Sequence, residues 1–154
     1  MTLTMPAPIF EIEDLRAHYL TRFGQKIQAV DGVSFSLKEG EILGIAGESG
    51  CGKTTLVSAC MGLYIPPLHQ SSGDVRVDGK SIIGMDVEQN RKDVLGRLVS
   101  MIPQGALNSL NPTRKVKDLA ADMILSHDEK ADKKEIQGRL RERFEKIGLD
   151  AELV

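Results

Sequence analysis

A glycine-rich run from Gly47 to Thr54, GESGCGKT, holds the residues in this sequence that are best suited to chemistry. The run fits the pattern G-x-x-x-x-G-K-[ST] at every fixed position. Glycines let the backbone fold into a concave nest whose N–H groups point inward and bind phosphate oxygens. Lys53 adds a cation for the outer phosphates, and the Thr54 hydroxyl is a suitable ligand for Mg²⁺. The predicted phosphate-binding residues are therefore Gly47, Glu48, Ser49, Gly50, Cys51, Gly52, Lys53 and Thr54.

The segments on either side decide between a phosphate site and a flexible turn that matches the pattern by chance. Residues 41–47, EILGIAG, are a short apolar run typical of a central strand covered on both faces. Thr54 to Met61 shows the pattern of a helix, with Gly62 as its C-terminal cap. A buried strand before the loop and a helix after it are the context that the motif requires. We therefore favour a phosphate site at a helix N-terminus, whose dipole favours anions.

Cys51 lies at a variable position inside the loop. A thiol near the start of a helix is reactive in some proteins, which is one interpretation of this residue. A small residue tolerated at a variable position is the interpretation that we favour. Cys51 and Cys60 show neither a disulfide framework nor a C-x-x-C metal spacing, so the sequence indicates a reducing compartment.

The overall composition is that of an ordinary globular protein. The 154 residues are 41% apolar and 27% charged, with a formal net charge of −2. This balance lacks the basic footprint of a nucleic-acid-binding protein, so we expect no nucleic acid as a partner. The N-terminus lacks the features of a secretory signal, and no uncharged stretch has the ~20 apolar residues that span a bilayer. We therefore expect no direct membrane insertion, and any membrane role would come through a partner.

The pattern before and after the loop predicts a mixed α/β fold. Residues 10–19 alternate between apolar and polar with one change of parity, which indicates a strand with a bulge, and residues 33–37 alternate cleanly. Turn signals at Gly24 and at Asp78-Gly79 indicate two hairpins. Residues 96–104, GRLVSMIPQ, are typical of a second buried strand.

After Pro112 the pattern changes to helices. Apolar residues recur at helical spacing from Val116 to Ile124 and again from Ile136 to Ile147. We therefore place a boundary near residue 110, with strands and the phosphate loop in residues 1–110 and helices in residues 111–154.

Three stretches resemble the ATP-binding subunits of ABC transporters, and more narrowly those that serve peptide and nickel importers. The stretches are AVDGVSFSLKEGEILGIAGESGCGKTTL, SGDVRVDGKSI and MIPQGALNSLNP, and they occur in the family's order. The resemblance implies a P-loop NTPase of ABC type that binds ATP with Mg²⁺. It implies an N-terminal antiparallel β subdomain, an incomplete RecA-like core and, in residues 111–154, the start of a helical subdomain.

The resemblance also implies roles outside the loop. Tyr19 lies where the family places an aromatic ring that stacks on adenine, whereas a plain strand-surface aromatic is the alternative. Thr55 would add a hydroxyl contact to the phosphates. Gln104 matches a glutamine whose amide reaches Mg²⁺ or the attacking water, although Gly105-Ala106 replaces the acidic residue and proline that commonly follow. The predicted catalytic residues are thus Lys53 and Gln104, and the predicted metal ligands are Thr54 and Gln104.

Three parts of the family lie beyond Val154: the LSGGQ-like signature, the Walker B strand with the catalytic Glu, and the switch His. Asp86, which ends the run IIGMD, stands too early in the chain to replace Walker B. We therefore expect an N-terminal fragment that binds nucleotide weakly and does not hydrolyse it usefully, whereas the full-length protein would be an ATPase. The implied partners are membrane permease subunits, bound through the region of Gln104, and a second ATP-binding subunit. The implied location is the cytoplasmic face of the cell membrane.

Other functions stay open. A soluble P-loop kinase or GTPase would need a phosphate-acceptor lid or a guanine-specific run, and we find neither in the sequence. A non-transport ABC-type ATPase is disfavoured by the slightly acidic balance and by the importer-like segment at Gln104. A non-catalytic nucleotide-binding fragment is what this chain would be by itself. The three histidines, His18, His69 and His127, stand at no metal-ligand spacing.

Overall fold

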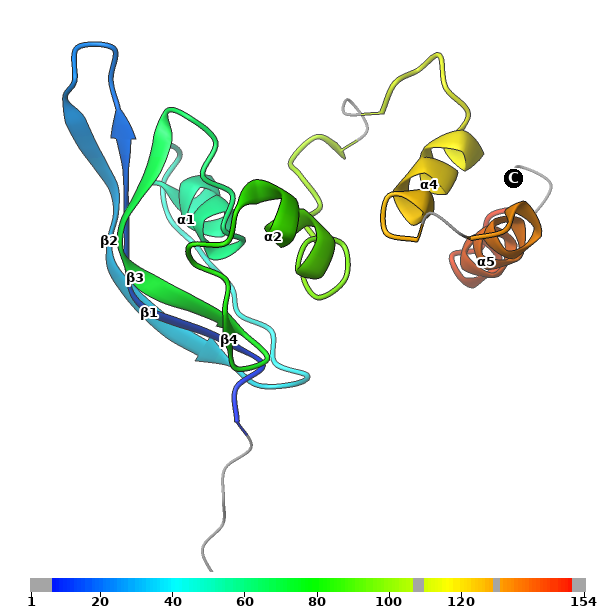
Figure 1. Ribbon diagram of the computed structural model, residues 1–154, viewed down its shortest axis with the longest axis horizontal. Helices are drawn as coiled ribbons and strands as arrows, with labels where there is room; N and C mark the ends of the chain where they lie inside the picture. The colour runs from blue at the N-terminus through cyan, green and yellow to red at the C-terminus, as the bar shows by residue number, and fades with distance from the viewer. Residues whose placement is uncertain (1–6, 107–109, 129–130, 151–154) are drawn as a thin grey trace, which may run out of the picture. The chain divides into compact units, whose positions relative to one another are not determined.

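The computed structural model describes residues 7–106, 110–128 and 131–150 (Figure 1). The chain divides into two compact units, one within Met1–Ser100 and the other within Met101–Val154. The first unit contains the strands β1 (Phe10–Leu20), β2 (Lys26–Leu37), β3 (Leu68–Val77) and β4 (Lys80–Ser81), and the helices α1 (Lys53–Cys60) and α2 (Val87–Asp93). The second contains α4 (Val116–Leu125) and α5 (Lys133–Lys146). The functional boundary placed near residue 110 stays a prediction.

The strands of the first unit form one antiparallel sheet in the order β2-β1-β3-β4 (Figure 1). Gly24 turns β1 into β2 with a φ of 78°. Asp78 and Gly79 turn β3 into β4 with φ values of 49° and 72°, as a tight two-residue hairpin of right-handed twist requires. Both hairpins, and the antiparallel character of this part, are therefore confirmed.

Strand β1 contains the predicted bulge. Its register with β2 shifts between Ile12 and Leu15, where Asp14 has a φ of 44°. The Asp14 N–H donates to the Ser34 Oγ at 2.8 Å. The extra residue reverses the alternation, so that Leu15 and Ala17 are buried on the same side as Ile12.

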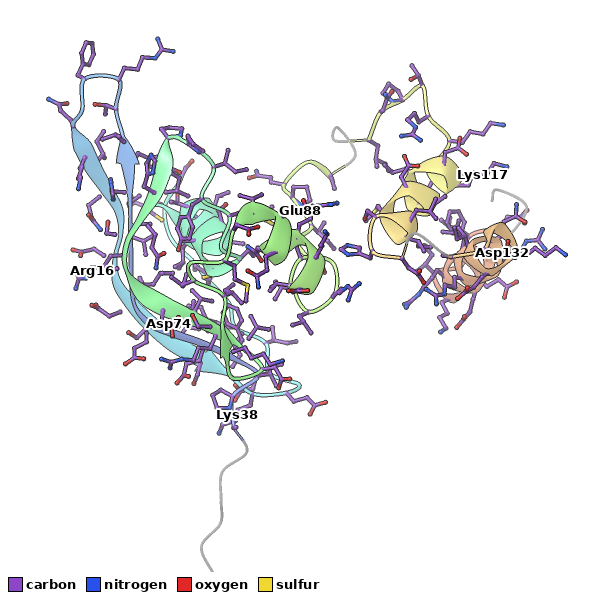
Figure 2. The ribbon with its side chains drawn as sticks, in the orientation of Figure 1. Arg16, Lys38, Asp74, Glu88, Lys117 and Asp132 are labelled. Carbon is purple, nitrogen blue, oxygen red and sulfur yellow. The ribbon has the colours of Figure 1, made fainter. Side chains whose placement is uncertain are left out.

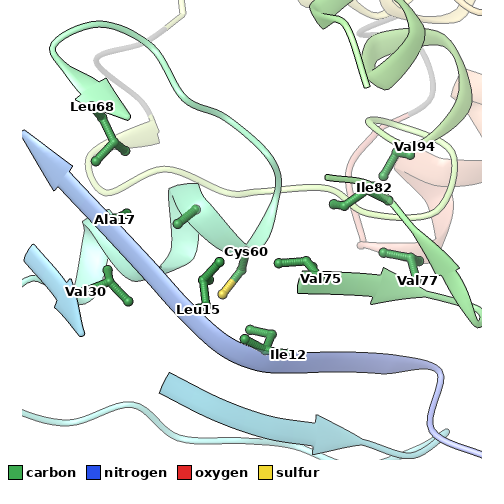
Figure 3. Close-up of a cluster of buried hydrophobic side chains, with 11 residues drawn as sticks. Ile12, Leu15, Ala17, Val30, Cys60, Leu68, Val75, Val77, Ile82 and Val94 are labelled. Carbon is green, nitrogen blue, oxygen red and sulfur yellow. The ribbon is translucent and has the colours of Figure 1, made fainter. Parts of the chain in front are cut away.

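The hydrophobic core joins the sheet to the helices α1 and α2 (Figure 3). Leu15 of β1 and Val75 of β3 are fully buried, and Cys60 of α1 belongs to the same cluster. Ala59, also fully buried, has a side chain small enough to let α1 approach the strands closely. The remaining members of the cluster are Ile12, Ala17, Val30, Leu68, Val77, Ile82 and Val94.

Two sets of hydrogen bonds cap the C-terminal end of α1. Gly62, the predicted cap, has a φ of 67°, and the N–H of Leu63 donates to the Ser58 carbonyl at 2.9 Å. This is the backbone pattern with which many helices end on a left-handed glycine. In addition, the buried side chain of Asn90 in α2 donates its Nδ2 to the Met61 carbonyl at 3.1 Å. Helix α2 therefore helps to fix the position of α1.

Two runs predicted as buried strands have another conformation. Residues 41–47 have no regular secondary structure, and Ile42 is 98% exposed. Residues 96–104 form only an isolated bridge, and Ile102 is 89% exposed. A central strand needs neighbours for its backbone groups and cover on both faces. No strand among the described residues pairs with either run, so their apolar composition does not lead to burial.

Asp86 begins a helix, α2, that the sequence pattern did not predict. Its carboxylate accepts the Gln89 N–H at 2.8 Å, so Asp86 is the N-cap of α2 and is not the end of a strand. Glu88 forms ion pairs with Arg91 and Lys92 along the exposed side of α2 (Figure 2). The spacing of Asp86 and Gln89 is that of a capping box, which is a signal that predicts this helix.

The helices predicted after Pro112 are present in the second unit. Helices α4 and α5 contact each other, and Ile136 and Leu140 of α5 are buried. Ile147 was expected on the same face but is exposed, because α5 ends at Lys146.

Gly73 provides a test of how closely β3 passes the bulge of β1. Its φ is 91°, and a Cβ on it would lie 2.4 Å from the Asp14 carbonyl oxygen. We predict that Gly73→Ala lowers the free energy of unfolding by ~3 kcal/mol or more, because left-handed strain and overpacking add. The matched control is Gly79→Ala, which has a φ of 72° and open space around the added Cβ. It should cost only ~1–2 kcal/mol.

Urea unfolding followed by circular dichroism compares the two variants. Equal losses would show that β3 does not approach β1 as closely as the structure places it.

Candidate functional site

The glycine-rich loop lies directly before α1. Gly50 and Gly52 have φ values of 81° and 96°, which residues with a side chain rarely adopt. A Cβ on Gly52 would lie 2.9 Å from the Ala29 carbonyl oxygen of β2, and one on Gly47 would lie 2.8 Å from the Cys51 Sγ. Gly52 therefore needs to be glycine for the loop to lie against β2, and Gly50 favours glycine through its left-handed backbone, whereas the atom near Gly47 is the end of a side chain that can move.

Lys53 folds back across the loop. Its Nζ donates to the Gly47 carbonyl at 2.8 Å and to the Glu48 carbonyl at 2.7 Å, and lies 3.6 Å from the Cys51 Sγ. The ammonium group thus ties the two ends of the loop together. A phosphate oxygen carries negative charge and is a stronger acceptor than a neutral carbonyl. The same ammonium group is therefore placed to bind phosphate at this loop.

The first turn of α1 adds backbone donors. The Leu56 N–H makes the first bond of the helical ladder, to the Gly52 carbonyl at 2.8 Å. The N–H groups of Lys53, Thr54 and Thr55 precede that bond and have no acceptor inside the helix. Helix α1 has no acidic residue in its first turn, so no carboxylate there offsets the positive end of its dipole. These features favour an anion.

The Thr54 and Thr55 hydroxyls lie in different surroundings. Thr54 is exposed, whereas Thr55 is 9% exposed and shares the sheet-facing side of α1 with Ala59. The Thr55 Oγ1 and the Tyr19 Oη of β1 share a hydrogen bond of 2.8 Å. The structure therefore brings Tyr19 and Thr55 together at the start of α1. Their predicted contacts with adenine and phosphate stay predictions.

A cleft of about 230 Å³ lies beside the loop. This volume is below the ~300–1,000 Å³ of pockets that enclose a whole ligand, so it suits part of a nucleotide. The cleft is lined by Ala29, Val30, Asp31, Val33, Ile45, Ala46, Cys51, Gly52, Lys53 and Leu56.

Asp31 is the acidic residue that lines this cleft, and it is ion-paired with Arg16. Arg16 also pairs with Asp14 at 3.0 Å, and its side chain lies on the side of the sheet away from α1 (Figure 2). The hydrogen bond to Asp14, with the charges of Asp14 and Asp31, raises the pKa of Arg16 above its ordinary value. Asp31 is therefore engaged as the partner of an arginine.

Gln104 belongs to the second unit, where it lies in an exposed turn beside Gly105, whose φ is 72°. Its predicted contacts with Mg²⁺ and with the attacking water stay predictions. Residues 107–109, which are part of the predicted permease-contact segment, lie outside the described residues.

His18 and His69 are cross-strand neighbours in β1 and β3. Their rings stack with centroids 5.8 Å apart, and the His18 Nδ1 lies 2.7 Å from the Ser71 Oγ. Burial, followed by the charges of Lys26 and His69, lowers the pKa of His18. Within the described ranges, no three His, Cys, Asp or Glu side chains gather as a metal site. Residue spacing in the sequence could not have predicted this pair, because the pair depends on the register between β1 and β3.

A glycine loop bridged by a lysine and leading into a helix is the phosphate loop of a P-loop nucleotide-binding domain, although residues 41–47 before it do not form the strand that usually precedes it. Residues 30–153 match the family model described as ABC transporter. The chain therefore belongs to the ABC transporter family. In the part of the chain that the structure describes, no helix combines the length and the apolar character needed to cross a bilayer.

Several transport proteins are similar to this chain. The oligopeptide transport ATP-binding protein OppD of Bacillus subtilis is 35% identical over 142 residues, which cover 92% of this chain and 39% of that protein. OppF of Escherichia coli is 33% identical over 154 residues, covering 95% and 44%. The dipeptide transport ATP-binding protein DppD of Caldanaerobacter subterraneus is 35% identical over 146 residues, again covering 95% and 44%. The chain thus spans less than half the length of these curated relatives.

The two cysteines provide a test of the packing around the site. Cys51 is exposed in the loop, whereas burial raises the pKa of the Cys60 thiol to about 12. We predict that at about pH 8 a thiol reagent modifies Cys51 in the folded chain and leaves Cys60 intact, because the thiolate is the reactive form. Mass spectrometry of the labelled peptides gives the two rates.

The Cys51→Ser variant should lose the fast reaction, and Cys60 should react only after unfolding in urea. Equal rates for both thiols in the folded protein would contradict the burial of Cys60.

Proposed function

We propose that this chain is the ATP-binding part of an ABC importer subunit that serves peptides or related solutes such as nickel. The observation that carries the proposal is the Lys53 ammonium group, held across the glycine loop beside the free N–H groups of α1. Membership of the ABC transporter family supports the same assignment. The names of the relatives, which are oligopeptide and dipeptide transport ATP-binding proteins, favour peptides as the solute class.

The residues present fit the polyphosphate part of ATP. Gly52 leaves no room for a Cβ because it lies against the Ala29 carbonyl of β2, and its left-handed backbone turns the loop into the first turn of α1. Lys53 would bind the outer phosphates. The exposed Thr54 hydroxyl would ligate Mg²⁺. A bound Mg²⁺ would neutralise phosphate charge.

Tyr19 is the proposed adenine contact. Its ring is half-buried on β1 and packs against the hydrophobic core, and its hydroxyl reaches Thr55 in the first turn of α1. Tyr19 is not among the residues that line the cleft beside the loop. Stacking of a base on an aromatic ring contributes ~1–3 kcal/mol in comparable contacts.

Hydrolysis needs a carboxylate that polarises the attacking water. Among the residues that line the cleft, Asp31 is the acidic one, and Arg16 engages it. We therefore propose that this chain binds ATP and that the hydrolytic groups belong to other parts of the full-length protein or to a second ATP-binding subunit. The same observation favours a second candidate function, a non-catalytic nucleotide-binding module. In the transporter, the Gln104 region would contact the permease subunits at the cytoplasmic face of the membrane.

Replacement of Lys53 tests the proposed function. We predict that Lys53→Ala weakens MgATP binding by about 10- to 100-fold, because a hydrogen bond to a charged group contributes ~1.5–3 kcal/mol. Isothermal titration calorimetry measures the affinity, and circular dichroism checks that the variant keeps its fold. Lys80→Ala, on the exposed β4, is the matched control and should bind like the parent chain.

Unchanged MgATP affinity in a folded Lys53→Ala variant would contradict the proposed ATP-binding function. Tighter binding of GTP than of ATP would point to another class of P-loop protein.

Replacement of Tyr19 tests the adenine contact. We predict that Tyr19→Ala weakens ATP binding by about tenfold, the size of a lost stacking contact. Pyrophosphate binding should fall much less, because pyrophosphate has no base. Phe23→Ala, which removes an exposed aromatic ring at the β1–β2 turn, is the control and should change neither affinity. Losses of the same size for ATP and pyrophosphate would argue against stacking.

A further inference from the structure

Thr55 has two polar groups that serve different parts of the fold. Its side-chain hydroxyl shares a 2.8 Å hydrogen bond with the Tyr19 hydroxyl. Its backbone N–H lies in the first turn of α1, before the first bond of the helical ladder, where it has no acceptor inside the helix. Thr55 thus contacts β1 through its side-chain hydroxyl, whereas its backbone N–H is available to a ligand at the phosphate loop.

The spacing along α1 explains why this hydroxyl faces the sheet. Thr55 and Ala59 are four residues apart, lie on one side of the helix and are both buried. Thr54 is one residue earlier, about 100° around the helix axis, and is exposed. The Thr54 hydroxyl is therefore open to a ligand, whereas the Thr55 hydroxyl is committed to Tyr19.

The backbone of Tyr19 is fixed before any ligand is considered. Tyr19 pairs with Ile27 of β2 and Leu68 of β3, and the neighbouring Leu20 N–H donates to the Pro67 carbonyl at 2.8 Å. The remaining freedom of the residue is rotation about its two side-chain torsions. The hydrogen bond to Thr55 holds the Tyr19 Oη in place, which fixes the first side-chain torsion and the direction of the long axis of the ring. Oη lies on the axis of the second torsion, so packing against the hydrophobic core, and not this hydrogen bond, limits rotation of the ring plane.

We infer that Thr55 is a positioning residue that couples the phosphate loop to the base-contact residue Tyr19, so that phosphate bound at the loop fixes the Tyr19 ring. The inference rests on the proposed function, since it assigns the loop to phosphate and Tyr19 to the base. It gives the Thr55 side chain a role other than direct contact with phosphate. Phosphate that binds the Thr55 N–H orders the first turn of α1, and the shared hydrogen bond passes that order to Tyr19.

Coupling of this kind is reciprocal. If phosphate favours one orientation of the Tyr19 ring, a base stacked on that ring favours the phosphate-bound loop by the same factor. The hydrogen bond should therefore strengthen binding of ligands that carry both groups, and should leave ligands that carry phosphate alone almost unaffected.

A double-mutant cycle on the full 154-residue chain tests this inference. Tyr19→Phe keeps the ring and removes the hydroxyl, and Thr55→Val keeps the shape and removes the partner hydroxyl. We expect each variant to weaken MgATP binding about fivefold, the size of one net hydrogen bond, and the double variant also about fivefold. Pyrophosphate affinity should stay within about twofold in all three. Thr55→Ser, which keeps the hydroxyl, is the matched control and should bind MgATP like the parent chain.

A spectroscopic measurement reports the same coupling independently. The sequence has two tyrosines and no tryptophan, so in a Tyr64→Phe background the tyrosine emission comes from Tyr19 alone. We expect pyrophosphate to change that emission, although pyrophosphate has no base to contact the ring. Adding Thr55→Val should abolish the change while pyrophosphate still binds. This readout does not move if Thr55 merely stabilises the fold.

The outcomes separate this inference from the proposed function. A parent chain that binds neither MgATP nor pyrophosphate would overturn the proposed function, and the coupling with it. A parent chain that binds both, with an ATP-to-pyrophosphate affinity ratio unchanged in Tyr19→Phe and Thr55→Val, would overturn the coupling alone. Losses that multiply in the double variant, or equal losses for both ligands, would also overturn it.

Discussion

The packing of α1 against the antiparallel sheet is the constraint on which the candidate site depends. Ala59 and Cys60 bring the helix down onto Leu15 and Val75, and a larger side chain at Ala59 would hold the helix away. At the opposite end, the approach of Gly52 to β2 fixes where the helix begins. Because both ends are anchored, the fold sets where the N–H groups of the first turn lie, and a bound phosphate has only their residual motion to order, which lowers the entropic cost of binding.

Features that depend on neighbours along the chain could be predicted from the sequence. The hairpins at Gly24 and at Asp78-Gly79, and the glycine cap at Gly62, each depend on one or two residues that must adopt a left-handed backbone conformation. The bulge at Asp14 could be predicted because a change of parity in a strand has few other causes. The phosphate loop belongs to the same class, since its pattern specifies a local backbone shape.

Features that depend on distant partners could not be predicted in the same way. The apolar runs 41–47 and 96–104 indicate a preference for burial, but their composition does not say which strand lies beside them. The hydrogen bond between Tyr19 and Thr55 and the stacked pair of His18 and His69 both depend on a strand or a helix placed by tertiary packing. The loop motif and the family resemblance supplied the candidate members of the site, which stay predictions, whereas only the fold shows that Tyr19 and Thr55 are in contact.

The open conformation of residues 41–47 has a consequence for how this chain behaves in solution. The run has no proline and a single charge, and its Ile42 and Leu43 side chains are exposed with unpaired backbone around them. Such a segment offers both an apolar surface and a hydrogen-bonding edge to another copy of itself. Residues 41–47 therefore offer an edge through which copies of this chain can associate at high concentration.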